Sequence, residues 1–224
     1  MKKIIPLLLI FGIFEMSCGK TKKEEVVAID KKEVKADVVK VPNKPEQVLK
    51  EVAVIATFYG DLVVEFFDDT APKHVESFKI HAKKGYYDGT IFHRIIPGFM
   101  IQGGDPNTKS DNKASYGTGG YAAKFYGIGD EKKPETWNVP AEFSKINHKR
   151  GILSMARSTS PNSGGSQFFI CAADAPHLNG QYTVFGQVIE GLNVLEQIVN
   201  LPKDARDNPT GRVEMKITLE KRSE

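Results

Sequence analysis

The chain has 224 residues, 40% of them hydrophobic and 26% charged, which is ordinary for a globular protein with a substantial core. The formal net charge is +3. Residues 1–50 hold 11 of the 31 Lys/Arg and 7 of the 28 Asp/Glu, which leaves 20 and 21 for residues 51–224. A nearly neutral main segment gives no electrostatic basis for nucleic-acid binding, so we expect no nucleic-acid partner.

Residues 1–18 have the pattern of a signal peptide. Two lysines (Lys2, Lys3) precede an uncharged apolar run, Ile4–Phe14, which is too short to span a bilayer comfortably. Plain secretion of a soluble protein and a buried N-terminal core segment are the alternatives.

The end of this segment, Ser17-Cys18, is similar to a bacterial lipoprotein signal, in which the Cys becomes the lipidated first residue. Glu15 departs from that signal, which usually has an apolar residue there. The similarity implies a lipid anchor on Cys18, and hence a cell-envelope protein on the periplasmic side or the outer surface.

Residues 19–50 are rich in Lys, Glu, Asp and Val, contain Pro42 and Pro45, and have no aromatic residue. Such a segment buries too little apolar surface to offset the entropy lost on ordering. We interpret it as a disordered tether in front of a folded domain at residues 51–224.

The domain opens with a predicted β-hairpin. Val52–Phe58 and Leu62–Phe67 alternate as strands do, and Tyr59-Gly60-Asp61 joins them. A helix is predicted next: it begins near Pro72 and ends at Gly85.

The stretch Phe92–Asp105 places one guanidinium, Arg94, in an apolar run, with the amide of Gln102 eight residues later. A strand that arranged Arg94, Phe99, Met100 and Gln102 around one cavity would form an apolar pocket with a few fixed donors. A buried strand whose Arg extends to solvent is the alternative.

Residues 106–140 form a polar, Gly-rich connection. A loop of this length is unusual without a function or partial order. It either forms one wall of a substrate groove or is a tolerated surface insertion.

The C-terminal part returns to regular patterns. Gln181–Val188 reads as a strand, Gly191–Asn200 as a second helix, and Met215, Ile217 and Leu219 alternate in a last strand. Many short strands with two helices fit an all-β fold, a closed barrel with helices over its open ends.

Three motifs occur in register: Phe-His-Arg-Ile-Ile-Pro-Gly-Phe-Met from Phe92, Gly-Ser-Gln-Phe-Phe-Ile from Gly165, and Thr-Val-Phe-Gly from Thr183. Together they closely resemble the cyclophilin family of peptidyl-prolyl cis–trans isomerases, over about Ala53–Leu219. The resemblance implies a closed eight-stranded antiparallel β-barrel capped by two α-helices. It also implies proline-containing polypeptides as substrates, assistance to the folding of exported proteins, a monomer, and no metal or cofactor.

The resemblance also implies the roles of individual residues. Arg94 directs its guanidinium at the prolyl nitrogen, and Gln102 orients that guanidinium and bonds the substrate backbone. The substrate-binding residues it implies are His93 at the pocket rim, Phe185 at the pocket base, and Phe99, Met100, Ala156, Arg157, Phe169, His177, Leu178 and Tyr182 around them.

Three positions depart from the commonest family pattern. Arg157 stands where many members have Asn, His177 where many eukaryotic members have Trp, and Tyr182 where those have His. The last two resemble bacterial members, and none removes Arg94 or Gln102.

Other chemistries find less support. Gly164–Phe168 lacks the last Gly of a Gly-x-Ser-x-Gly nucleophile turn, and the five histidines show no zinc-ligand spacing. Two hypotheses remain, an envelope-tethered isomerase and a non-catalytic module that binds proline peptides. Arg94 and Gln102 favour catalysis, because a pure binder needs only the pocket.

Overall fold

The computed structural model describes residues 49–223. The predicted signal segment with Cys18 and the predicted tether up to residue 48 lie outside these residues. The strands are β1 (Leu49–Thr57), β2 (Gly60–Phe66), β3 (Thr90–Ile91), β4 (Arg94–Ile96), β5 (Met100–Gly103), β6 (Ile152–Met155), β7 (Phe168–Cys171), β8 (Val184–Glu190) and β9 (Glu214–Ser223). The α-helices are α1 (Pro72–Lys83) and α2 (Leu192–Val199), and 3-10 turns occupy Pro106–Lys109, Lys113–Ser115, Pro134–Thr136 and Pro176–Leu178.

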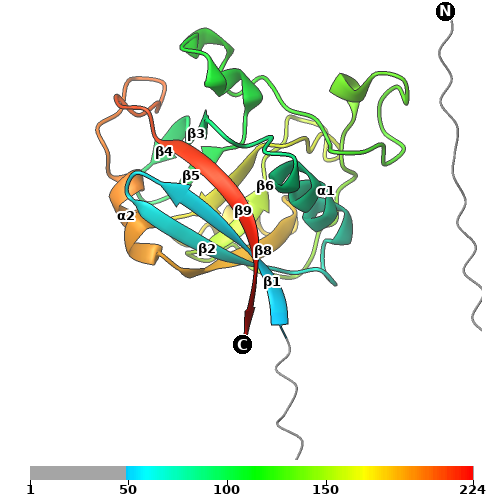
Figure 1. Ribbon diagram of the computed structural model, residues 1–224, viewed down its shortest axis with the longest axis horizontal. Coiled ribbons are helices and arrows are strands. Elements are labelled where there is room, and N and C mark those ends of the chain that lie inside the picture. Colours follow the sequence, from blue (N-terminus) through cyan, green and yellow to red (C-terminus); the bar gives the residue numbers. More distant parts are fainter. Residues whose placement is uncertain (1–48, 224) are drawn as a thin grey trace, which may run out of the picture. The chain divides into compact units, whose positions relative to one another are not determined.

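The strands form one curled sheet in the order β3-β9-β1-β2-β8-β6-β7-β5-β4, and every pair is antiparallel (Figure 1). The prediction of a closed eight-stranded barrel was therefore wrong: the described sheet has nine strands and two edges. The edge strands β3 and β4 are very short, and the two residues between them donate their backbone N–H groups to separate parts of the sheet region. Phe92 N–H donates to Val213 O, and His93 N–H donates to Gln102 O.

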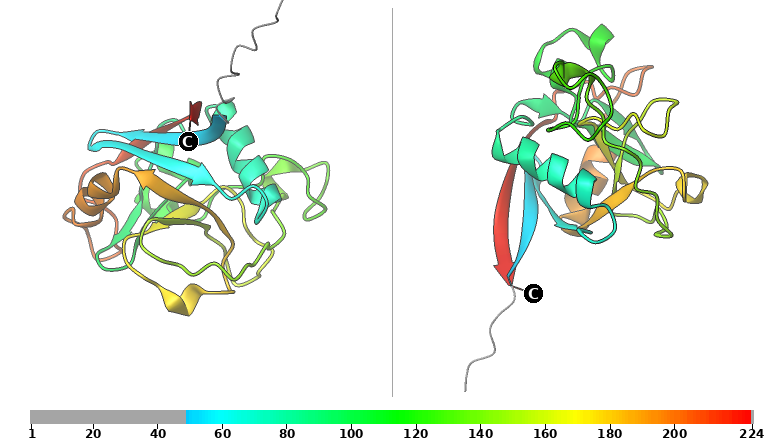
Figure 2. Two further views of the ribbon diagram at one scale, coloured as in Figure 1. Left: turned by 90° about the horizontal axis from the view of Figure 1, so that it is seen from below. Right: turned by 90° about the vertical axis from the view of Figure 1, so that its right-hand side faces the viewer.

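The two helices pack at opposite ends of the curled sheet, against one shared core (Figures 1 and 2). α1 contributes Val75 and Phe78, and α2 contributes Leu195 and Ile198. Aromatic rings fill the centre, and Phe78 lies 5.0–5.7 Å from four of them: Phe66, Tyr87, Phe168 and Phe185. Such contacts add to the stabilisation from buried area.

A carboxylate from a distant segment caps the start of α1. Ala71 at the N-cap offers no side-chain acceptor, and Glu142 accepts hydrogen bonds from Lys73 N and His74 N at 3.1 and 3.0 Å. The Glu142 carboxylate also lies 2.7 Å from His74 Nδ1. Burial alone would raise the pKa of Glu142, but the hydrogen bonds from His74 and Lys73 outweigh it and the pKa is lowered.

The long connection 106–140 is tied to α1 at several points. His81 Nε2 donates to Tyr121 O at 2.8 Å, and Ala123 N donates to Ser77 Oγ at 2.9 Å. Lys124 Nζ lies 2.6 Å from Glu76 Oε1. Because its backbone polar groups find partners on the helix, this connection is an ordered part of the domain.

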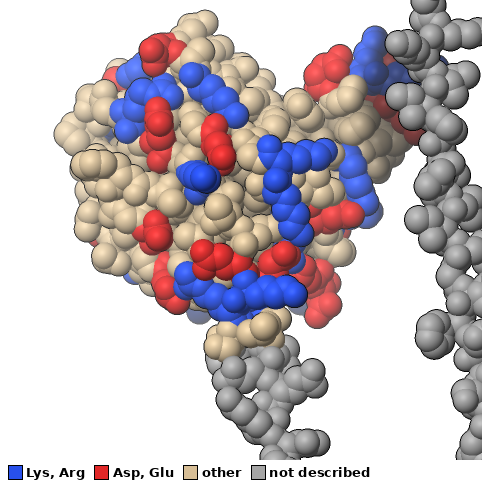
Figure 3. Space-filling model, in the orientation of Figure 1, with Lys and Arg blue, Asp and Glu red and all other residues tan. Residues whose placement is uncertain are grey.

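Within residues 49–223, no helix combines the length and the hydropathy needed to cross a bilayer. Lys/Arg and Asp/Glu side chains are interspersed on the face shown in Figure 3, so this face carries no continuous patch of one sign. The face therefore provides no strong electrostatic steering of a charged polymer.

The buried histidine of α1 predicts a pH-dependent stability. Burial, countered in part by the hydrogen bond to Tyr121, lowers the pKa of His81 from 6.5 to about 4. The unfolded chain therefore binds more protons than the folded chain between these values, and stability is lost as pH falls through that window. We expect the titration of His81 to lower the free energy of unfolding by about 2 kcal/mol as the pH falls from 6.5 to 5.

Urea unfolding at several pH values measures this effect. His81→Asn should lower stability at pH 7 but flatten its decline toward pH 5. Tyr86→Phe is the matched control, because Tyr86 packs 3.9 Å from the His81 ring and its raised pKa of about 12 keeps it from titrating there. Equal pH slopes in wild type and His81→Asn would contradict the assignment.

Candidate active site

Strand register places the predicted catalytic residues in one row. In the ladder β4–β5–β7, Arg94 is opposite Gln102, and Gln102 is opposite Phe169. Residues directly opposite each other project to the same face of a sheet. The curled sheet thus carries a cation, an amide and an aromatic ring side by side.

The turn between β4 and β5 places the next two pocket residues. Phe99 N donates to Ile96 O at 3.0 Å across Pro97-Gly98, and Gly98 has a φ of +72°. Pro at the second position of a turn and a positive φ at the third are typical of a type II turn. The chain thereby reverses within four residues, and Phe99 and Met100 lie beside the row.

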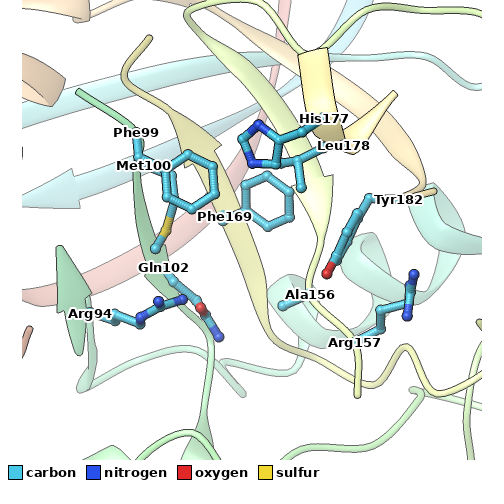
Figure 4. Close-up of a pocket in the computed structure, with 10 residues that line it drawn as sticks. All are labelled: Arg94, Phe99, Met100, Gln102, Ala156, Arg157, Phe169, His177, Leu178 and Tyr182. Atoms are coloured by element: carbon cyan, nitrogen blue, oxygen red, sulfur yellow. The ribbon is translucent and has the colours of Figure 1, made fainter. Parts of the chain in front are cut away.

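Ten of the twelve predicted site residues line one pocket of about 340 Å³ (Figure 4). Its apolar part is formed by Phe99, Met100, Phe169 and Leu178, and the other lining residues are Arg94, Gln102, Ala156, Arg157, His177 and Tyr182. The His177 ring is exposed and lies 5.4 Å from the ring of Phe99. The pocket is a concavity with one apolar side and several polar side chains around it, a combination suited to binding a ligand in one orientation.

Two predicted site residues lie elsewhere. Phe185 is not the pocket base: Val184 is paired with Ser154, which is paired with Phe169, so the alternation of β8 turns Phe185 to the opposite, core face. His93 is not at the rim, because its ring is buried at 3% exposure and lies 6.4 Å from the Tyr116 ring. Burial, countered in part by the charge of Asp105, lowers the pKa of His93 to about 4.

Arg94 is half exposed and has one nearby carboxylate. Its Nε lies 3.8 Å from Asp207 Oδ2, and Asp207 also lies 2.7 Å from Lys203 Nζ. Asp207 has a φ of +65°, a strained value for a residue other than Gly, and its carbonyl accepts a hydrogen bond from Ile95 N. The two terminal nitrogens of Arg94 make no hydrogen bond to the described residues, so they are available to a ligand.

Gln102 is held by a residue that the sequence analysis missed. Gln102 Nε2 donates to Gln167 Oε1 at 3.0 Å, and Gln167 Nε2 donates to Gly119 O at 2.7 Å. Gln102 makes no hydrogen bond to Arg94 within the described residues, although the two lie side by side in Figure 4. Alternation was the available signal, because Gln167 precedes Phe169 by two positions and projects to the same face.

The floor of the pocket is supported from behind by a neutral histidine. The ring of His148 is stacked on Phe169, with centroids 6.0 Å apart and an interplanar angle of 17°. His148 Nε2 is 3.0 Å from Ser154 Oγ, and its Nδ1 is 3.3 Å from Asn179 Oδ1. Burial, opposed by the hydrogen bond with Asn179, lowers the pKa of His148. The Phe169 ring therefore packs against an uncharged His148 imidazole near neutral pH.

Nothing in the described residues suggests covalent or metal chemistry at this site. No group of three or more His, Cys, Asp or Glu side chains within residues 49–223 is arranged to hold a metal ion. The thiol of Cys171 is buried beneath the pocket, and burial raises its pKa to about 12, which disfavours the nucleophilic thiolate.

Comparison with known proteins agrees with this geometry. Residues 52–219 match the family described as "Cyclophilin type peptidyl-prolyl cis-trans isomerase/CLD". A peptidyl-prolyl cis-trans isomerase of Arabidopsis thaliana is 43% identical over 164 residues, which cover 73% of this chain and 92% of that protein.

A Brucella abortus protein named "Probable peptidyl-prolyl cis-trans isomerase" is 45% identical, and the match spans 62% of this chain and 66% of that protein. A crystal structure of a Cryptosporidium parvum cyclophilin type isomerase, determined in the presence of the dipeptide Ala-Pro, superposes with a TM-score of 0.65. It is 37% identical and covers 75% of this chain and 98% of that one. The chain belongs to the cyclophilin-type family of peptidyl-prolyl cis-trans isomerases.

Proposed function

We propose that the pocket binds an Xaa-Pro segment of a polypeptide and accelerates rotation about its prolyl peptide bond. The observation that carries this is the row Arg94–Gln102–Phe169, which lines one pocket together with the apolar side chains Phe99, Met100 and Leu178. The related Cryptosporidium structure was determined in the presence of the dipeptide Ala-Pro, which is consistent with a proline-sized occupant.

The chemistry of rotation explains why these groups suffice. Resonance in the amide creates a barrier of about 18–20 kcal/mol, and both isomers are populated ahead of proline. In the twisted state the nitrogen loses conjugation and becomes a better hydrogen-bond acceptor. A catalyst therefore needs to bind the twisted state more tightly than either planar isomer, and each 1.36 kcal/mol of that preference gives about a tenfold rate.

Each part of the pocket has a role in this scheme. The apolar side chains Phe99, Met100, Phe169 and Leu178 anchor the proline ring. The free terminal nitrogens of Arg94 donate to the prolyl nitrogen as it pyramidalises. Gln102, fixed through its amide nitrogen by Gln167, presents its oxygen to a substrate backbone N–H.

We also propose that the full-length protein is anchored in the cell envelope and assists the folding of exported proteins. The support is sequence-based: the lysines and apolar run of residues 1–18, Ser17-Cys18 at their end, and a Lys-rich stretch before the domain. A lipid on Cys18 would hold the isomerase close to chains that emerge from the membrane.

Arg94→Ala should lower kcat/KM for a proline peptide by about 10²–10³, the usual cost of losing one preorganised donor to a developing acceptor. A protease-coupled or NMR exchange assay on the purified chain measures this. Arg150→Ala is the matched control, because Arg150 pairs with Glu196 outside the pocket. A folded Arg94→Ala protein with wild-type rates would exclude Arg94 as the catalytic donor. A wild-type protein that binds the peptide without accelerating its isomerisation would instead support the non-catalytic binding module.

Gln167→Ala should lower kcat roughly tenfold with a smaller change in KM, because it releases the amide of Gln102. If Gln167 acts through Gln102, the Gln167→Ala substitution should lower kcat little further in a protein that already carries Gln102→Ala. The double-mutant cycle should then be strongly non-additive. Gln187→Ala, which removes a half-buried Gln bonded to Glu65, is the control. Additive losses would show that Gln167 acts independently of Gln102.

Cys18→Ser should move the protein from the membrane fraction to a soluble or uncleaved form, because two or more acyl chains are needed for stable anchoring and Cys18 is their proposed site. Membrane fractionation and a shift in apparent mass measure this. Cys171→Ala is the control, since it removes the buried cysteine instead. Unchanged membrane attachment of the Cys18→Ser protein would refute the lipid anchor.

A further inference from the structure

A second pocket continues the first along the surface. It has a volume of about 210 Å³ and is lined mainly by polar groups and by backbone of the connection Gly117–Gly120. The two pockets share three lining residues, Gln102, Ala156 and Arg157. An extended peptide that leaves the proline pocket toward the second one therefore passes Arg157.

The charges along this path have one sign. Arg94 and Arg157 lie on either side of Gln102 and Ala156 (Figure 4), and neither pocket has an Asp or Glu among its lining residues. The described domain as a whole is close to neutral, so this groove is locally cationic. Two carboxylates lie near the lining: Asp207 is 3.8 Å from Arg94 Nε, and Asp105 accepts a hydrogen bond from Gly117 N. Arg157, by contrast, has no described carboxylate within ion-pair distance.

Arg157 carries a charge that the described residues leave uncompensated. Its guanidinium forms no ion pair with any described carboxylate, whereas Arg150, Arg212 and Arg222 each do. Instead, Nε donates to Gln181 O at 3.0 Å, and Nη1 donates to Ser158 O and Thr159 O at 2.9 and 3.2 Å. These acceptors are neutral carbonyls, so they fix the group without neutralising it.

The same contacts make the guanidinium rigid. Its Cζ lies 4.5 Å from the centre of the Tyr182 ring, so a pocket aromatic holds one of its faces. The remaining terminal nitrogen, Nη2, makes no hydrogen bond to the described residues. A substrate carboxylate would therefore gain a charge-assisted hydrogen bond, and little side-chain entropy would be lost in forming it.

We infer that Arg157 is a specificity-determining residue that gives this isomerase a preference for proline peptides with an acidic side chain near the Xaa-Pro bond. The inference rests on the proposed function and adds a substrate class to it. The ion pair between Arg157 and the substrate carboxylate would be partly exposed. The preference in kcat/KM for Glu over its uncharged isostere Gln should therefore be about three- to fivefold. It should weaken as ionic strength rises.

The test uses one set of short Xaa-Pro peptides, with Glu, Gln or Lys placed in turn at each of two positions before and two after the Xaa-Pro pair. For wild type, kcat/KM should decrease in the order Glu, Gln, Lys at one of these positions, because a fixed guanidinium reaches the side chain at one position only. In Arg157→Gln the ratio of Glu to Gln should fall to about one. Arg157→Lys, which keeps the positive charge but loses the planar guanidinium with its several N–H donors, should give an intermediate ratio.

Arg150→Gln is the matched control and should leave every ratio unchanged, since Arg150 lies outside both pockets. Equal rates for Glu and Gln peptides in wild type, or a preference that survives in a folded Arg157→Gln protein, would overturn the inference. If no peptide is turned over, the proposed function fails. Fluorescence anisotropy of the same peptides then decides the charge preference separately, through the ratio of Kd values for wild type and Arg157→Gln.

Discussion

Strands β5, β6, β7 and β8 are buried on both faces, and the rest of the structure depends on this constraint. One face packs Ile101, Leu153, Phe168 and Phe185 into the core that α1 and α2 cover. The other face carries Met100, Phe169, Cys171 and Val184 in a smaller cluster beneath the pocket. Because alternation has a period of two, a slip by one residue would exchange core and pocket residues, so the core fixes the register of the site.

The long connection 106–140 forms a wall beside the strands that carry the site, and the two together enclose a groove. Tyr121, near the middle of the connection, accepts a hydrogen bond from His81 of α1, and Glu142, just after its end, binds the first turn of α1. Gly119 O accepts a hydrogen bond from Gln167. Of the two interpretations left open by the sequence, the groove wall agrees with the residues Gly117–Gly120 that line the second pocket. The glycines suit this role, since a Cβ on Gly119 would come within 2.5 Å of Asp105 and one on Gly120 within 2.4 Å of Ser166.

Much of the fold and most of the pocket could be predicted from the sequence, and the failures have physical causes. The hairpin β1–β2 and both helices follow from periodicity and turn residues, and the ten pocket residues follow from the family resemblance. Phe185 was misplaced because a motif records residue identity but not the face of a strand. The pairing of the edge strand β3 with β9 and the hydrogen bond between Gln102 and Gln167 join residues 65 or more positions apart. Alternation gives the face on which Gln167 lies, but no local pattern gives either partner.

Isomerisation about a prolyl bond forms no covalent intermediate, so rate enhancement depends on placement alone. The site meets this demand because its cation, amide and ring sit on paired strands, whose ladder hydrogen bonds hold the backbone more rigidly than a loop would. Asp207 adds to this through its strained backbone, which anchors Ile95 next to Arg94. The residues that differ from the commonest family pattern, Arg157, His177 and Tyr182, all lie where the groove meets solvent. The row proposed to perform the chemistry is therefore separate from the rim residues proposed to select the peptide.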